Sequence, residues 1–481
     1  MTFLEFKKHG ALVVSILFAF GVSLSLLYPS PVGPPDNGDF ARIFASFSSG
    51  PIGLDFRPTP QDQEAYRKRF FNFYHRFWQL DNGRPGFAQT VSSSHPFFWP
   101  GRFGNLTPGV FDLAWNTFLL IFIAGCILFV TLRNMAGYSS FFSVTAVTLI
   151  FADVNIVGYV NSFYQESGAF LSFIVLIYSL HYLWVHRTAL SLGMVCASAL
   201  MLIGSKVAYS LSVLPAMFPL LLGVALYTGR NPRLRLYVIA VVLLLSLASV
   251  LFIKHLAAVT LDERRGNCYH FIFAGAIRFL PSDSSKHYLE ELGLDPSLVS
   301  LKGKSAYDPD SQFEILSPEL NAKLHVKALT RLAFHYPQTF IEMVRFGLSK
   351  VGYYPPLLFP SSSDPNGIKP RFRWSLWSKL HSYFLHGVFY FALVLCLTFV
   401  LMISIWKEKD FWPLFYLLGT AGFILACFTQ VLTSIIGDGP MDIVKHNFFA
   451  NILLDSAFVF VSCGLITILM NRWTRGIQSG R

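Results

Sequence analysis

Charged residues are scarce in this sequence. Only 14% of its 481 residues are Asp, Glu, Lys or Arg, and 53% are hydrophobic. A soluble domain usually carries about 25% charged residues, so this chain is not a soluble globular protein. The net charge of +11 says little about nucleic acid, because in a membrane protein the positions of the basic residues matter more than their sum. We expect an integral membrane protein with no nucleic-acid partner.

The sequence also lacks the signatures of nucleotide, zinc and disulfide sites. It has no P-loop, no Cys/His spacing suited to zinc and no internal repeat. Of its six cysteines, only Cys268 falls outside the apolar runs, so no disulfide framework is available. If the protein transfers a group, the missing nucleotide motif is compatible with a donor that is attached to a lipid carrier rather than to a nucleotide.

Apolar runs of the roughly 20 residues needed to cross a bilayer occur along most of the chain. We expect ten spans, at about 11–29, 111–132, 138–152, 167–185, 188–204, 207–227, 235–253, 383–405, 411–433 and 447–470. The third is short. The sixth contains Pro215 and Pro219, which allow a broken or re-entrant segment. The predicted fold is an all-α polytopic membrane protein.

Basic residues in the short connections gather on one side of these spans. That side holds Lys7, Lys8, Arg133, Arg187, Arg230, Arg233, Arg235, Lys407, Lys409, Arg472, Arg475 and Arg481. The positive-inside rule makes this side cytoplasmic, together with both termini. No small-residue cleavage site follows the first apolar run, so we expect that run to be an uncleaved anchor.

Two long segments, about 30–110 and 254–382, then lie outside the cytoplasm. We divide the chain into an N-terminal membrane module, 1–253, an outer loop region, 254–382, and a C-terminal membrane module, 383–481. Aromatic residues at helical spacing from Gln61 to Trp78 predict a helix at the membrane interface or packed on the protein. Further on, Ser317 predicts a helix start and Pro337 the start of the next helix.

Short polar clusters follow the spans on the outer side. They are Asp36 with Asp39; the segment 161–166, with Tyr164 and Glu166; Lys206; and Asp438, Asp442, Lys445 and His446. A carboxylate in such a place can remove a proton from a sugar hydroxyl. Basic side chains can stabilise an anionic phosphate leaving group, and the candidates are Lys206, Lys445, His446, Arg264 and Arg265. An inverting sugar transfer from a lipid phosphate needs both functions.

Each candidate also has a purely local interpretation. Asp36 and Asp39 could cap a turn, and Glu166 could stabilise a helix N-terminus. Lys206 could be an interfacial lysine. The glycines beside Asp438 fit a tight turn, and the residues from 442 to 446 fit a pairing at a helix start. The sequence alone does not show that the clusters converge.

Several of these segments resemble one known family. They are similar to the bacterial hexosyltransferases of surface (S-layer) glycan biosynthesis in Asn37-Gly38-Asp39-Phe40-Ala41-Arg42, Asn161-Ser162-Phe163-Tyr164-Gln165-Glu166, Ser205-Lys206-Val207, Leu289-Glu290-Glu291-Leu292-Gly293-Leu294-Asp295-Pro296, Gly437-Asp438-Gly439 and Lys445-His446. That family resembles the GT-C class of polytopic glycosyltransferases. The resemblance implies a bacterial plasma-membrane enzyme, a polyprenyl-phosphate hexose donor and a catalytic carboxylate in the first outer loop.

The position that matches this carboxylate is Asp39, with Asp36 second. Some members of the class need a divalent metal ion and others do not. The spacing Asp36-x-x-Asp39 differs from the Asp-x-Asp pair that is usual in the metal-dependent members. This leaves metal use open.

We therefore predict transfer of a hexose from a polyprenyl phosphate to a glycan or lipid-linked acceptor at the outer face. The candidate catalytic carboxylates are Asp39 as general base, Asp36 and Glu166; the candidate substrate contacts are Tyr164, Lys206, Arg264, Arg265, Asp438, Asp442, Lys445 and His446. One alternative is a lipid-linked glycan transporter or flippase, against which the spans poor in mid-membrane charge and the lack of repeats argue. Another is a glycan polymerase or ligase that uses a diphosphate-linked oligosaccharide.

Overall fold

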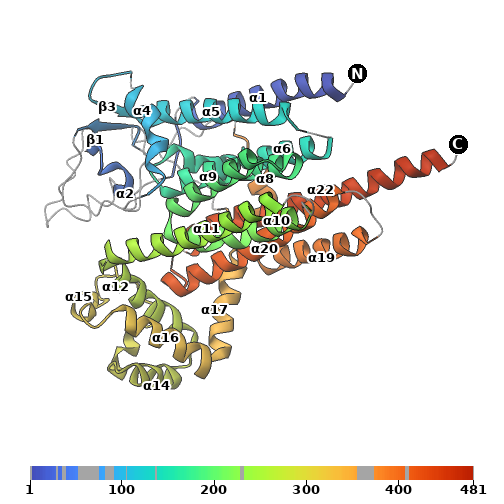
Figure 1. The fold of residues 1–481 in the computed structure, drawn as a ribbon. Helices are drawn as coiled ribbons and strands as arrows, with labels where there is room; N and C mark the ends of the chain where they lie inside the picture. Colours follow the sequence, from blue (N-terminus) through green and yellow to red (C-terminus); the bar gives the residue numbers. More distant parts are fainter. Residues whose placement is uncertain are drawn as a thin grey trace.

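The fold is a bundle of long apolar helices that carries two smaller units at one end (Figure 1). The computed structural model describes residues 3–28, 31–34, 40–52, 75–81, 92–104, 106–135, 138–227, 232–259, 261–354, 373–406, 411–441 and 443–479. Both chain ends lie at the opposite end of the bundle from the two smaller units. We call the end that carries these units the loop-bearing end.

Each apolar run expected to cross the membrane is helical. These helices are α1 (Phe3–Leu27), α5 (Leu113–Arg133), α6 (Tyr138–Phe151), α8 (Gln165–His186), α9 (Ala189–Ser205), α10 (Val207–Tyr227), α11 (Pro232–Val259), α19 (Gly387–Ile405), α20 (Phe411–Asp438) and α22 (Phe448–Ser479). Among the described residues, eight helices are long and apolar enough to cross a membrane, and α6 with the turns after it makes a ninth candidate. The tenth, α9, is a shorter apolar helix of 17 residues. The prediction of a polytopic helical membrane protein is confirmed.

The break in the bundle lies elsewhere than expected. The sixth span, α10, runs unbroken from Val207 to Tyr227 with both prolines inside it. The third span is the bent one: α6 ends at Phe151, and the segment formed by α7 (Val154–Val157) and η2 (Gly158–Asn161) turns by 71°. Asp153 caps α7 by accepting a hydrogen bond from the backbone N–H of Asn155, which explains where the new direction starts.

A small antiparallel sheet belongs to the first unit at the loop-bearing end, which is an addition to the all-α expectation. Its strands are β1 (Ser48–Pro51), β2 (Phe77–Leu80) and β3 (Val110–Asp112), in the order β1-β2-β3. Trp78 pairs with Phe111, and Gly50 pairs with Gln79. The prediction of a helix up to Trp78 is therefore wrong at its end, while residues 61–74 lie outside the described part. Short helices complete the unit: α2 (Ala41–Phe44), η1 (His95–Phe98) and α4 (Trp99–Phe103).

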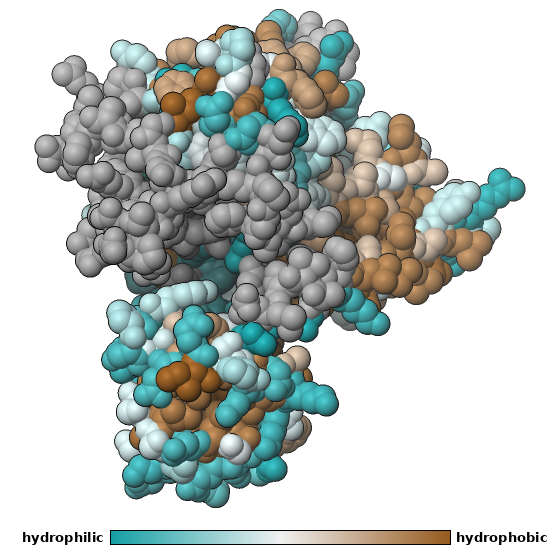
Figure 2. Space-filling view, turned by 90° about the vertical axis from the view of Figure 1, so that its left-hand side faces the viewer, coloured by the Kyte–Doolittle hydropathy of each residue, from teal (hydrophilic) through white to brown (hydrophobic). Residues whose placement is uncertain are grey.

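The second unit is helical. It comprises α12 (Leu261–Tyr269), η3 (His270–Ala276, a π-helix), α13 (Ile277–Phe279), α14 (Ser282–Leu292), η4 (Pro296–Leu301), α15 (Phe313–Leu316), α16 (Ala322–His335) and α17 (Pro337–Ser349). The start predicted at Pro337 is confirmed. The start predicted at Ser317 is wrong, because Asn321 caps α16 with hydrogen bonds to Lys323 and Leu324. Viewed from the loop-bearing end, this unit has a hydrophilic rim around a hydrophobic patch (Figure 2).

Two further short helices precede bundle helices: α18 (Leu376–Tyr383) lies before α19, and α21 (Ile443–His446) lies between α20 and α22. Within the bundle, α20 packs against both α10 and α22. Gly422 permits the first contact, since a β-carbon there would lie 2.4 Å from the carbonyl oxygen of Ala216 on α10. Small residues at such crossings let membrane helices approach closely.

This contact gives a test of the bundle. We expect Gly422→Ala to lower the free energy of unfolding by about 1–3 kcal/mol, because the added methyl group forces two backbones apart. Gly193→Ala on α9 is the matched control, since a β-carbon there meets nothing within 4 Å. Thermal unfolding of the two variants in detergent measures the difference. Equal melting temperatures would contradict the close packing of α10 on α20.

Candidate functional site

The segment between η2 and α8 holds the first unit in place. Its backbone is extended at Ser162 and at Tyr164, which precedes the first residue of α8. Asn161 donates from Nδ2 to the carbonyl oxygen of Val32 at 2.7 Å and accepts from the hydroxyl of Thr117 at 2.8 Å. The chain that follows α1 is thus tied to this segment and to α5.

Phe163 is the hydrophobic centre of the same unit. Its fully buried ring lies 4.8–6.0 Å, centroid to centroid, from six aromatic rings, those of Phe40, Phe44, Phe47, Trp78, Phe98 and Phe111. These rings come from four described segments between α1 and α5, namely 40–52, 75–81, 92–104 and the strand β3. Aromatic contacts of this kind bury large apolar areas and fix relative orientation.

Glu166 and Lys206 form a buried ion pair. Glu166 lies in the first turn of α8, and Lys206 is the single extended residue between α9 and α10. Lys206 Nζ lies 2.6 Å from Glu166 Oε1, and the two side chains are only 11% and 2% exposed. Lys206 therefore points into the protein rather than along its surface. The pair fixes the start of α8 against the junction of α9 and α10.

Tyr164 brings together two segments that are distant in sequence. Lys445 Nζ lies 4.9 Å from the centre of its ring, a cation–π contact. Phe40 packs edge-on against the same ring at 4.7 Å between centroids. Phe40 is the residue after Asp39 in the sequence, and Lys445 belongs to α21. Two of the predicted polar clusters and the residue that follows Asp39 therefore meet at Tyr164.

Asp438, the last residue of α20, binds two histidines. Its Oδ1 lies 2.5 Å from His270 Nδ1, and its Oδ2 lies 3.1 Å from His446 Nε2. Gly439 then turns the chain in a left-handed conformation (φ 61°), where a β-carbon would lie 2.9 Å from the carbonyl oxygen of His270. The glycine that suggested a tight turn is thus required by the close approach of η3.

The remaining predicted site residues are placed as follows. Arg264 and Arg265 are half-buried on α12, which packs against α16 and α20. Asp36, Asp39 and Asp442 lie outside the described residues. Within the described ranges, no group of three or more His, Cys, Asp or Glu side chains is arranged to hold a metal ion.

A run of serines that we did not predict as part of the site contacts the start of α8 and the end of α9. Ser92 Oγ donates to the carbonyl oxygen of Ser205 at 2.7 Å, and Ser94 Oγ donates to that of Gln165 at 2.9 Å. Gly168 leaves the space, since a β-carbon there would lie 2.4 Å from Ser94 Oγ. The serines therefore hold the segment between α1 and α5 against both helix ends that carry the ion pair.

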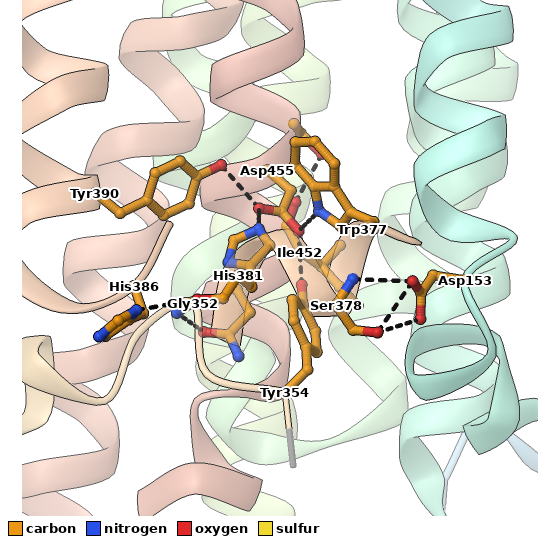
Figure 3. A network of polar contacts seen from close by, with 12 residues as sticks. Asp153, Gly352, Tyr354, Trp377, Ser378, His381, His386, Tyr390, Ile452 and Asp455 are labelled. Atoms are coloured by element: carbon orange, nitrogen blue, oxygen red, sulfur yellow. Dashed lines mark hydrogen bonds and ion pairs between the residues drawn. The ribbon is translucent and has the colours of Figure 1, made fainter. Parts of the chain in front are cut away.

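A second polar network was also missed, and it lies inside the bundle (Figure 3). Asp455 of α22 is fully buried. Its Oδ2 accepts from the hydroxyl of Tyr354 at 2.7 Å and from the indole N–H of Trp377 at 2.8 Å, and its Oδ1 accepts from the hydroxyl of Tyr390 at 2.9 Å. His381 Nε2 lies 3.0 Å from Oδ1. These groups surround both carboxylate oxygens, so the charge needs no water.

The network holds α18 between two parts of the bundle. On its other side, Asp153 accepts from the backbone N–H and the hydroxyl of Ser378, both at 2.9 Å (Figure 3). One helical turn from Asp455, Asn451 accepts from the backbone N–H of Gly352 at 2.7 Å. The spans, which we expected to be poor in charge, therefore include one fully buried carboxylate, Asp455, within the run 447–470. The spacing of Asn447, Asn451 and Asp455, four residues apart in an apolar run, was the available signal.

Comparison with protein-family models gives one match. Residues 2–479 match the family described as the YfdI N-terminal transmembrane domain. No curated protein and no solved structure matches the chain.

The Asp455 network predicts a graded loss of stability. Asp455→Ala leaves several buried donors without an acceptor, so we expect the free energy of unfolding to fall by about 3–5 kcal/mol. Tyr390→Phe removes one of several donors, and we expect a loss of about 1 kcal/mol. Thermal unfolding in detergent ranks the variants. If Asp455→Ala had the same melting temperature as the wild-type protein, the network would not be holding α18 and α19 to α22.

Proposed function

The chain belongs to the YfdI N-terminal transmembrane domain family, and from this premise we propose that it is a glycosyltransferase-like membrane enzyme. The enzyme transfers a hexose from a polyprenyl phosphate to a glycan or lipid-linked acceptor. The reaction takes place at the outer face of a bacterial plasma membrane, and both termini are cytoplasmic. The Lys/Arg bias of the short connections supports this orientation.

The observation that carries the proposal is the convergence of separate polar clusters at the loop-bearing end. Val32 binds Asn161, and Phe40 packs on Tyr164. The stretch that contains Asp36 and Asp39 is thus flanked in sequence by two residues that contact one short segment. That segment also contacts Lys445 and leads directly to the pair of Glu166 and Lys206.

The chemistry follows from these residue types. Asp39 acts as the general base that removes the proton of the acceptor hydroxyl. The hydroxyl oxygen attacks the anomeric carbon of the hexose with inversion, and the polyprenyl phosphate leaves with the electron pair of the broken C–O bond. Lys445 and His446 provide positive charge where the phosphate becomes more negative.

The contacts refine two of the predicted roles. Lys206 is neutralised by Glu166, so we assign this pair to holding the site in shape and raising its polarity, with Asp36 and Asp442 as further acidic groups. Arg264 and Arg265 are a second source of positive charge, contributed by α12. The similarity to surface-glycan hexosyltransferases supports a cell-surface glycan as the destination of the sugar.

A substitution that keeps the shape of the base tests the reaction. We expect Asp39→Asn to lower the rate of hexose transfer by about 10²–10⁴-fold, the usual contribution of a general base, with normal expression and folding. Asp283→Asn, at an exposed position in the first turn of α14, is the matched control and should retain full activity. Transfer from a purified polyprenyl-phosphate hexose in nanodiscs is the measurement.

Three results would overturn the proposal. Full activity of Asp39→Asn would show that Asp39 is not the general base. A wild-type protein that ignores the monophosphate but transfers a diphosphate-linked oligosaccharide would be a polymerase or ligase. A protein that moves a lipid-linked glycan between leaflets without forming a new glycosidic bond would be a flippase.

A further inference from the structure

The carboxylate of Asp438 holds two histidines that have different surroundings. His270 comes from η3 in the second unit, and His446 comes from α21 beside the last span. The side chain of His270 is 4% exposed, whereas that of His446 is 23% exposed. One carboxylate therefore links a buried imidazole to an accessible one.

Both ring nitrogens of His270 are committed within the protein. The backbone N–H of Ala306 donates to Nε2 at 3.0 Å, so Nε2 is an acceptor and carries no proton. The proton of the neutral ring is then on Nδ1, which donates to Asp438 Oδ1 at 2.5 Å. His270 is consequently a neutral tie between the second unit and the end of α20.

Only one ring nitrogen of His446 has a hydrogen-bond partner among the described residues. A carboxylate can only accept, so the His446 Nε2 that lies 3.1 Å from Asp438 Oδ2 carries a proton. Its Nδ1 makes no hydrogen bond to any residue that the structure describes. This nitrogen can take up a second proton and then donate it, while Asp438 stabilises the resulting imidazolium. A carboxylate that orients a histidine in this way is a familiar element of acid–base sites.

We propose that His446 is the general acid of the transfer reaction and that Asp438 is the residue that positions it. The inference rests on the proposed function. As the bond between the anomeric carbon and the phosphate oxygen breaks, that oxygen takes the electron pair. The His446 imidazolium gives its Nδ1 proton to the phosphate and becomes neutral, while Asp39 holds the proton taken from the acceptor. Asp438, which we predicted as a substrate contact, is thereby reassigned to orienting an imidazole.

The neighbouring charged groups are consistent with a phosphate at this place. Lys445, the residue before His446, lies on the ring of Tyr164. Among the described residues, Asp438 contacts both histidines, the ring centroid of Tyr307 lies 5.5 Å from that of His270, and Tyr164 lies under Lys445; Glu166, two residues after Tyr164, is paired with Lys206. In the proposed site, Lys445 and a protonated His446 supply positive charge next to the phosphate.

Binding of the leaving group tests the assignment without requiring turnover. Polyprenyl phosphate is titrated onto the protein in nanodiscs, below and above the pH range in which imidazole loses its proton, with uncharged polyprenol as the comparison. We expect the wild type to bind the phosphate about tenfold more tightly at the lower pH, the gain of a charge-assisted hydrogen bond. His446→Gln should bind the phosphate weakly at both pH values. In Asp438→Asn the imidazolium loses its stabilising carboxylate, so the affinity should start to fall at a lower pH than in the wild type.

Two matched variants separate this role from a structural one. His287→Gln changes an exposed histidine, 66% exposed on α14, and should bind as the wild type does. His270→Gln should lower the melting temperature but retain the pH dependence of binding. This result would separate the stability of the fold from the pH dependence, which we assign to His446. Equal pH dependence in His446→Gln and wild type would overturn the assignment.

Transfer kinetics then distinguish the two proposals. If hexose transfer occurs and His446→Gln loses the alkaline fall of kcat/KM together with about 10²-fold in rate, both stand. If no hexose is transferred but binding still depends on His446, the proposed reaction fails and the phosphate contact stands. If transfer occurs with an unchanged pH profile in His446→Gln, only the general acid is lost.

Discussion

The buried ion pair of Glu166 and Lys206 fixes the geometry on which the rest of the site depends. Two charges are removed from water there, and such a pair is retained only with close geometry and support from its surroundings. The distance of 2.6 Å between Nζ and Oε1 provides the first condition, and the serine contacts to the neighbouring helix ends provide the second. Once the start of α8 is fixed, the preceding residues Asn161, Phe163 and Tyr164 are fixed as well. Those residues contact the segment between α1 and α5, and Tyr164 contacts Lys445.

The polar residues of the bundle fall into two groups with different tasks. Asp455 is surrounded by donors and fully buried, so its charge is used to join α18, α19 and α22. Asp438 is partly accessible and holds His270, whose two ring nitrogens are both bonded, and His446, whose Nδ1 has no hydrogen-bond partner among the described residues. A buried carboxylate with every oxygen occupied stabilises a fold, whereas a titratable group with a vacant position can take part in chemistry. In our proposal, the same residue type therefore stabilises the fold at Asp455 and positions a general acid at Asp438.

The sequence predicted the parts of this protein that depend on local composition. Long apolar runs can be satisfied in a membrane only as helices, so each expected run was found as a helix. Eight of the described helices are long enough to span and a bent pair gives a ninth candidate, whereas α9 is shorter, and Pro215 and Pro219 do not break α10. The strand Phe77–Leu80 was missed because its pairing with Val110–Asp112 is a tertiary contact, and aromatic residues fit a helix face or a strand equally well. The contact of Lys206 with Glu166 was likewise beyond local reasoning, because the partners are 40 residues apart. Asp455 was visible in the sequence, but its partners lie 65–101 positions away.

A cryo-EM structure of the protein in nanodiscs with polyprenyl phosphate tests the central claim, that the clusters around Tyr164 form one phosphate-binding site. The account predicts the phosphate group next to Lys445 and His446, at the loop-bearing end, with the isoprenoid chain leading between the helices toward the bilayer. A phosphate bound at the opposite end of the bundle, near Arg187 and Arg235, would contradict it.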